Sequence, residues 1–104
     1  MEQLLLRIYV REGMRHDGKR IHDWLFEQAQ ASGITGGTVF RASAGDGRHG
    51  LHEDSFFELA GALPETIEFL AAPERIEALL TRVGAAGLRL VYTTMAVRTS
   101  VTGG

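Results

Sequence analysis

The chain has 104 residues, of which 44% are hydrophobic and 23% charged, and its formal net charge is −2. This length accommodates a single domain, and the balance of apolar and charged residues excludes an intrinsically disordered chain. The slight acidic excess argues against nucleic-acid binding, which normally needs a basic surface, and the absence of cysteine excludes disulfides, thiolate catalysis and cysteine-ligated zinc.

The first predicted element is a strand over residues 4–10, because every second residue from Leu4 to Val10 is apolar. This segment has no basic leader and is too short for a signal peptide. No run reaches the roughly 18 apolar residues of a membrane span, so we expect a cytoplasmic protein without direct membrane insertion. The second strand face, with Leu5 and Tyr9, is mixed, which indicates that another subunit partly covers it.

A turn at residues 13–18 precedes a predicted helix that extends to about Ser32. Asp17 is expected to cap its N-terminus, and Gly33 is expected to end it in the left-handed conformation. Most positions on one helical face are apolar, and only Gln28 interrupts the spacing. The face consists of Ile21, Trp24, Leu25, Gln28 and Ala29.

The second strand is predicted for residues 36–42, and a polar segment with three glycines follows at residues 43–54. Long irregular segments in compact domains are usually functional or disordered. The third strand is expected to begin near Ser55, to be interrupted around Gly61 and to continue through residues 66–70.

The second helix is predicted to begin at Pro73, since proline suits the first turn of a helix and Glu74 is favourable there. It is expected to end at Gly84 to Gly87, and the last strand is predicted for residues 88–98. The order β, α, β, β, α, β predicts an α+β, ferredoxin-like fold over residues 1–104, a single domain. Both helices would cover one face of a four-stranded antiparallel sheet.

The histidines are the candidate metal ligands. His49 and His52, with Glu53 and Asp54, could bring two imidazoles and a carboxylate to one divalent ion. The alternative is a solvated loop that happens to contain histidine. Elsewhere, His22 is expected on the helix surface and His16 is expected to hydrogen-bond to backbone in the turn.

No set of residues points to catalysis. Asp23 and Glu27 lie one helical turn apart, which suits a solvated helix face as well as acid–base chemistry. Nucleophilic catalysis needs a nucleophile, a base and an orienting group within reach, and nothing selects Ser43, Ser55 or His52 for these roles. We therefore predict that the protein is not an enzyme.

Two glycines of the polar segment, Gly45 and Gly47, are followed by Arg48. Glycines let backbone N–H groups approach an anion, and arginine adds a charge-assisted contact. The alternative is a plain flexible loop, because a lone Gly-x-Gly is weak evidence for a site.

Residues 33–39, Gly-Ile-Thr-Gly-Gly-Thr-Val, resemble the stretch between helix one and strand two of PII signalling proteins, and residues 45–48, Gly-Asp-Gly-Arg, resemble the base of their T-loop. The chain as a whole more closely resembles the PII-like family catalogued as domain of unknown function 190. The matching segments are residues 5–10, 15–19, 38–41, 51–52, 63–68 and 74–80.

This resemblance implies a homotrimer with ligand clefts between neighbouring subunits and a T-loop-like segment at about residues 43–54. PII-type relatives bind adenine nucleotides and control a membrane transporter, an ion channel or an enzyme. By this analogy Gly45, Gly47 and Arg48 line the cleft, Thr38 lies near its base and Arg98 meets phosphates. No tightly bound cofactor is expected beyond an adenine nucleotide effector.

The departures from PII proteins concern charge. Asp46 stands where the PII motif has phenylalanine, and residues 83–88 are a reduced form of the glycine-rich phosphate-binding loop that precedes the last strand in PII proteins, without its lysine. A nucleotide less charged than a triphosphate is therefore easier to accommodate. Both tyrosines lie in predicted strands, so T-loop uridylylation is not expected. The alternative function is a divalent-metal-binding trimer of CutA type, with the ligands His49, His52, Glu53 and Asp54.

Overall fold

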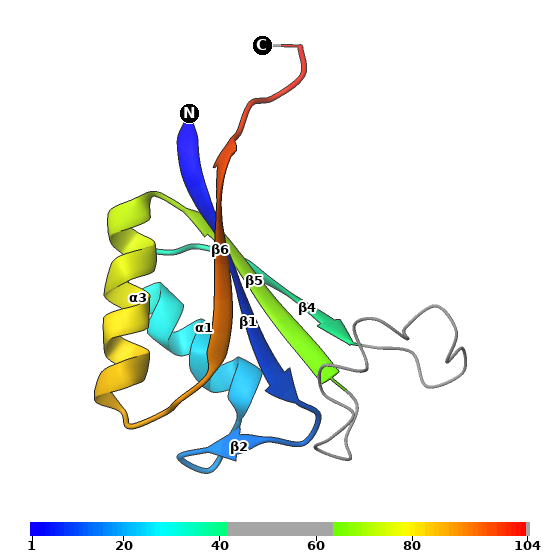
Figure 1. The fold of residues 1–104 in the computed structure, drawn as a ribbon, viewed down its shortest axis with the longest axis vertical. Coiled ribbons are helices and arrows are strands. Elements are labelled where there is room, and N and C mark those ends of the chain that lie inside the picture. The colour runs from blue at the N-terminus through cyan, green and yellow to red at the C-terminus, as the bar shows by residue number, and fades with distance from the viewer. Residues whose placement is uncertain (42–63, 104) are drawn as a thin grey trace.

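The computed structural model describes residues 1–41 and 64–103, and these form a four-stranded antiparallel sheet with two helices on one face (Figure 1). The sheet order is β4-β5-β1-β6. The strands of the sheet are β1 (Glu2–Arg11), β4 (Gly37–Arg41), β5 (Pro64–Ala71) and β6 (Val91–Arg98). The two helices are α1 (Ile21–Ala31) and α3 (Pro73–Ala85). A separate hairpin consists of the short strands β2 (Arg15–His16) and β3 (Lys19–Arg20). This is the predicted ferredoxin-like arrangement.

The core lies between the sheet and the two helices. Strand β1 is central, since Leu6 stands opposite Phe69 of β5 and opposite Thr94 of β6. Its alternation is as predicted, because Leu6, Ile8 and Val10 are buried. The helices contribute Ile21, Trp24, Leu25, Ala29, Ile76, Leu79 and Val83 to the same core.

Helix α1 begins later than predicted, and the expectation that Asp17 caps it is wrong. Asp17 has φ +54° and Gly18 has φ +77°, so these two residues form the turn of the β2–β3 hairpin. Arg20 directly precedes the helix and makes no side-chain cap. The helix therefore begins only after the hairpin, at Ile21, whose N–H donates to the carbonyl of Met14 at 2.9 Å.

The other helix ends agree with the sequence. Gly33 has φ +85°, and the N–H of Ile34 donates back to the carbonyl of Ala29 at 2.9 Å. Pro73 is the first residue of α3. The polar Gln28 on the inner face of α1 has a partner, since Arg82 Nε of α3 donates to its Oε1 at 3.0 Å.

The third and fourth strands of the fold differ in detail from the prediction. Strand β5 begins at Pro64, opposite Arg11, while the expected start near Ser55 lies outside the described residues. Strand β6 begins at Val91 rather than residue 88, because residues 88–90 form the connection from α3. In the part of the chain that the structure describes, no helix is long and apolar enough to cross a membrane.

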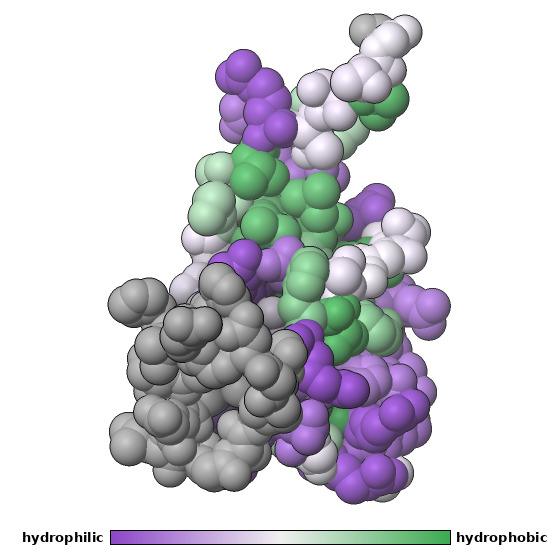
Figure 2. Space-filling model, turned by 90° about the vertical axis from the view of Figure 1, so that its right-hand side faces the viewer, coloured by the Kyte–Doolittle hydropathy of each residue, from purple (hydrophilic) through white to green (hydrophobic). Residues whose placement is uncertain are grey.

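Neither helix covers the opposite face of the sheet, and no other element among residues 1–41 and 64–103 packs on it; we call it the open face. The pairing register assigns to it alternate residues of all four strands. They are Leu5, Arg7, Tyr9, Thr38, Phe40, Thr66, Glu68, Leu70, Val91, Thr93, Met95 and Val97. Figure 2 views the side away from the helices and shows hydrophobic atoms gathered at its centre, with hydrophilic atoms above and below. Met95 is 60% exposed there.

Candidate functional site

Thr38, a predicted cleft residue, lies in a polar row across the open face. Thr38 of β4 pairs with Glu68 of β5, and Glu68 pairs in turn with Arg7 of β1. On its other side Arg7 pairs with Thr93 of β6. Arg7 Nε donates to Glu68 Oε2 at 2.7 Å, and its Nη2 lies at the same distance from that oxygen. The hydrogen bond to Glu68 raises the pKa of Arg7.

Arg98, the predicted phosphate contact, is far from this row. It is the last residue of β6 and pairs with Glu2, which belongs to the alternate positions of β1 that point toward the helices. Strands β4 and β6 are the two edges of the sheet. Thr38 and Arg98 therefore lie on opposite edges and opposite faces, and one chain does not bring them together.

The remaining predicted site residues lie outside the described residues. They are Gly45, Gly47 and Arg48 of the T-loop-like segment and the alternative metal ligands His49, His52, Glu53 and Asp54. Within residues 1–41 and 64–103, no three histidine, aspartate or glutamate side chains are grouped so that they could hold one metal ion.

A charged cluster that the sequence did not reveal stands where residues 42–63 leave and rejoin the sheet. Glu65 of β5 is only 3% exposed. Arg41, at the end of β4, donates from Nε to Glu65 Oε2 at 2.6 Å, and this bond is the main cause of the raised pKa of Arg41. Glu12 Oε2 lies 3.7 Å from the same Nε. The cluster ties β4 to β5 at this end of the sheet.

His22 joins the cluster from α1, so its expected place on the helix surface is wrong. Its Nδ1 lies 3.8 Å from Glu65 Oε1, and its side chain is only 14% exposed. His16, which was expected to hydrogen-bond to backbone in the turn, directly precedes the turn residues Asp17 and Gly18, and its ring packs edge-on against Trp24 with centroids 4.6 Å apart. One signal for the cluster was available: Glu65 occupies an inward position of β5, in alternation with the buried Ile67 and Phe69.

The described residues line at least two hollows on the helix side of the molecule. The smaller, about 200 Å³, is bordered by Phe26, Thr35, Gly37 and Phe69. It adjoins the run at residues 33–39 that resembles PII proteins. A Cβ at Gly37 would stand 2.6 Å from Phe69 Cε1 and 2.8 Å from Phe26 Cε1, so any side chain at this position would force the rings or the backbone to move.

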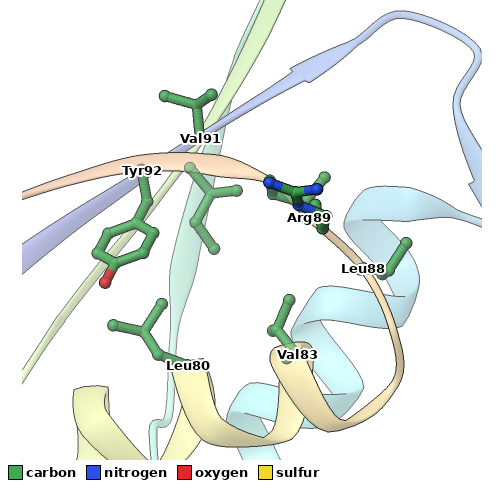
Figure 3. Close-up of a pocket in the computed structure, with 9 residues that line it drawn as sticks. Leu80, Val83, Leu88, Arg89, Val91 and Tyr92 are labelled. Carbon is green, nitrogen blue, oxygen red and sulfur yellow. The ribbon is translucent and has the colours of Figure 1, made fainter.

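The larger hollow, about 440 Å³, lies between α3 and β6 (Figure 3). Its lining is mostly aliphatic, and the labelled side chains of Tyr92, Leu80, Val83 and Leu88 surround it in the close-up, whereas Val91 points away. The lining residues are Ile8, Leu80, Val83, Gly84, Leu88, Arg89, Leu90, Val91 and Tyr92.

Curated proteins similar to the chain are described only by a family name. The UPF0166 protein of Aquifex aeolicus is 33% identical over 84 residues, which are 80% of each chain. The UPF0166 protein MJ1524 of Methanocaldococcus jannaschii is 32% identical over 79 residues, 76% of this chain and 73% of that protein.

Solved structures show the same fold at low sequence identity. A PII-like signalling protein of Thermus thermophilus, described as putative in its name, superposes with a TM-score of 0.59 at 14% identity, over 92% of this chain and 86% of that one. CPII of Thiomonas intermedia, a nitrogen regulatory PII-like protein bound to ADP, AMP and bicarbonate, superposes with a TM-score of 0.62 at 12% identity, over 96% and 97%. The family model of domain of unknown function 190 (DUF190), described as "Uncharacterized ACR", matches residues 3–99. The chain therefore belongs to the DUF190 family and has the fold of PII-like signalling proteins.

Proposed function

We propose that this protein is a PII-like regulator that binds an adenine nucleotide at clefts between the subunits of a homotrimer. Membership of the DUF190 family and the PII-like fold support the regulatory part. The ligands of CPII, which was solved with ADP and AMP, support the nucleotide. The proposal includes no catalytic step and places the protein in the cytoplasm.

The separation of Thr38 and Arg98 is the observation that carries the intersubunit site. The two residues stand on the two edge strands of one sheet, β4 and β6. A head-to-tail ring brings one edge of each copy beside the opposite edge of the next. In such a ring the edge strand that holds Thr38 comes beside the neighbour's edge strand that holds Arg98, so a cleft along this contact is formed by residues of two subunits.

The open face supports assembly for a separate reason. Phe40, Leu70, Val91 and Met95 are large apolar residues and each is more than 40% exposed. Contiguous apolar patches on a sheet face usually mark an interaction surface. The mixed composition of this face, with the Arg7–Glu68 pair at its centre, is suited to contact with other copies rather than to permanent exposure to water.

Regulation would act through residues 43–54, which belong to the stretch of chain between Arg41 at the end of β4 and Pro64 at the start of β5. Effector binding would shift the equilibrium between two arrangements of this segment, and a transporter, ion channel or enzyme would recognise one of them. This requires different effector affinities in the two arrangements, because equally tight binding to both shifts nothing.

Calorimetric titration of the full chain with AMP, ADP, ATP and cyclic AMP, with and without magnesium, tests the proposal. We expect saturable binding of AMP or ADP at about one site per subunit. Arg98→Gln should weaken it about tenfold, the loss typical of one charge-assisted hydrogen bond, while the exposed hairpin variant Arg20→Gln should not. Absence of heat with every nucleotide would overturn the proposal, and zinc binding that is lost in the His49→Ala/His52→Ala variant would favour the metal alternative.

A further inference from the structure

The hollow between α3 and β6 has the character of a small-molecule site. Its volume of about 440 Å³ lies within the roughly 300–1,000 Å³ that is usual for ligand pockets. Ile8 and Val83 are buried at its floor, and Leu80, Leu88 and Leu90 pack partly against the core around it. A ligand there would remove mainly aliphatic surface from water, which is favourable in proportion to the area covered.

Two polar groups border this apolar lining, and neither has a partner among the described residues. Arg89 lies in the connection from α3 to β6 and is exposed, and no hydrogen bond or ion pair joins it to residues 1–41 or 64–103. Tyr92 is 49% exposed, and its ring forms one wall of the hollow with the hydroxyl directed toward the α3 side (Figure 3). In ligand pockets that are mostly apolar, a small number of polar groups usually fixes the orientation of the ligand.

We propose that this hollow binds a small carboxylic acid with an apolar body, whose carboxylate pairs with Arg89. Arginine presents a planar fork of donors that matches a carboxylate. The hydrocarbon part would lie between Tyr92 and the aliphatic side chains of Leu80 and Val83. The Tyr92 hydroxyl provides a further donor for the acid.

The charge of the lining selects against more highly charged ligands. Arg89 is the only charged residue among the nine that line the hollow. A ligand with two or more negative charges would leave charge beside aliphatic side chains without compensation, which is costly. The hollow shares Val83, Gly84 and Leu88 with the reduced glycine-rich loop of residues 83–88, but its lining favours a ligand with a single negative charge, and the inference does not require nucleotide binding.

Methyl NMR on the full chain tests this site directly, with octanoate as the probe and octanamide as its uncharged analogue. We expect octanoate to shift the methyl signals of Leu80, Val83 and Leu88 to saturation, and octanamide to bind about tenfold more weakly, since it lacks the charge-assisted contact. Arg89→Gln should bind octanoate as weakly as the wild type binds octanamide. The exposed hairpin variant Arg20→Gln, which makes the same charge change, should bind as the wild type does.

A second variant is designed to fill the hollow. Gly84 borders it, and no atom lies within 4 Å of the position that a Cβ would take there. Gly84→Leu should keep the wild-type spectrum elsewhere and abolish octanoate binding. Equal binding of octanoate and octanamide, unchanged binding in Gly84→Leu, or shifts that do not saturate would each overturn the inference. Methyl signals of the lining residues that shift with protein concentration but not with octanoate would also overturn the inference, because they would show that another copy of the chain occupies the hollow.

Discussion

Arg41 and Glu65 hold the sheet together where the chain leaves it and returns. The Arg41 Nε lies 2.6 Å from Glu65 Oε2, and the two residues are opposite one another on β4 and β5. The carboxylate is buried whereas the side chain of Arg41 is 54% exposed. Loss of Arg41 would therefore destabilise the fold through the unpaired charge of Glu65, because the carboxylate has lost its access to water. Loss of Glu65 would leave the Arg41 guanidinium unpaired but still in contact with water.

This asymmetry predicts the result of a double-mutant cycle. Arg41→Met should destabilise the fold more than the double variant Arg41→Met/Glu65→Met, because the single change leaves a buried carboxylate without its cation and the double change removes both charges. Urea unfolding followed by circular dichroism measures the three free energies. If the losses of Arg41→Met and Glu65→Met added up to the loss of the double variant, the two residues would not be coupled.

The close backbone approach at Gly37 predicts a large effect of one methyl group. Gly37→Ala should lower the free energy of unfolding by about 1–3 kcal/mol, as is typical of overpacking, because the new Cβ would overlap the rings of Phe26 and Phe69. Gly36→Ala is the matched control, since nothing lies within 4 Å of its Cβ position, and its effect should stay within about 0.5 kcal/mol. Equal effects of the two changes would contradict the packing shown here.

The open face predicts how assembly can be blocked. Met95→Lys places a charge among exposed apolar residues of this face, so we expect it to lower the oligomeric state seen by sedimentation while the subunit keeps its fold. Ala78→Lys makes the same change on the exposed side of α3 and should leave the assembly intact. An oligomer that survives Met95→Lys would exclude the open face as the contact surface.

An ion pair on the hairpin predicts a pKa change that NMR can measure. Lys19 Nζ donates to Glu27 Oε1 at 2.7 Å, and this bond is the main cause that raises the pKa of Lys19 above its ordinary value of 10.5. The pair therefore stabilises the fold below that pH, and its contribution is lost as the pH rises through the pKa of the folded state. Glu27→Gln should lower the pKa of Lys19 toward the ordinary value.

Asp17→Asn provides the comparison for this titration. Asp17 contributes only a minor electrostatic attraction to Lys19, so its removal should change the Lys19 pKa less than Glu27→Gln does. A larger effect of Asp17→Asn would show that the hydrogen bond to Glu27 is not the dominant contact in solution.

The sequence predicted the elements well where their periodicity is local. Alternation at every second residue defined β1, and helical spacing with Pro73 and Gly33 as boundaries defined α3 and the end of α1. The start of α1 was missed because Asp17 is chemically suited both to a helix cap and to the turn of a hairpin. Because β2 pairs with β3, Asp17 lies in the turn of the hairpin and does not cap the helix. No pattern in the sequence of this segment indicates that pairing.

The sequence by itself determined the order of the two helices and of the four strands that form the main sheet, the fold class and the family, because each follows from short-range pattern and motif. Only the tertiary structure decided which side chains meet. Glu65, Arg41 and His22 come from β5, β4 and α1, so their contact depends on strand register and on how α1 docks against the sheet. The same holds for the hollow at Arg89, whose lining comes from β1, α3, β6 and the connection between α3 and β6, segments that only the packing of α3 on the sheet brings together.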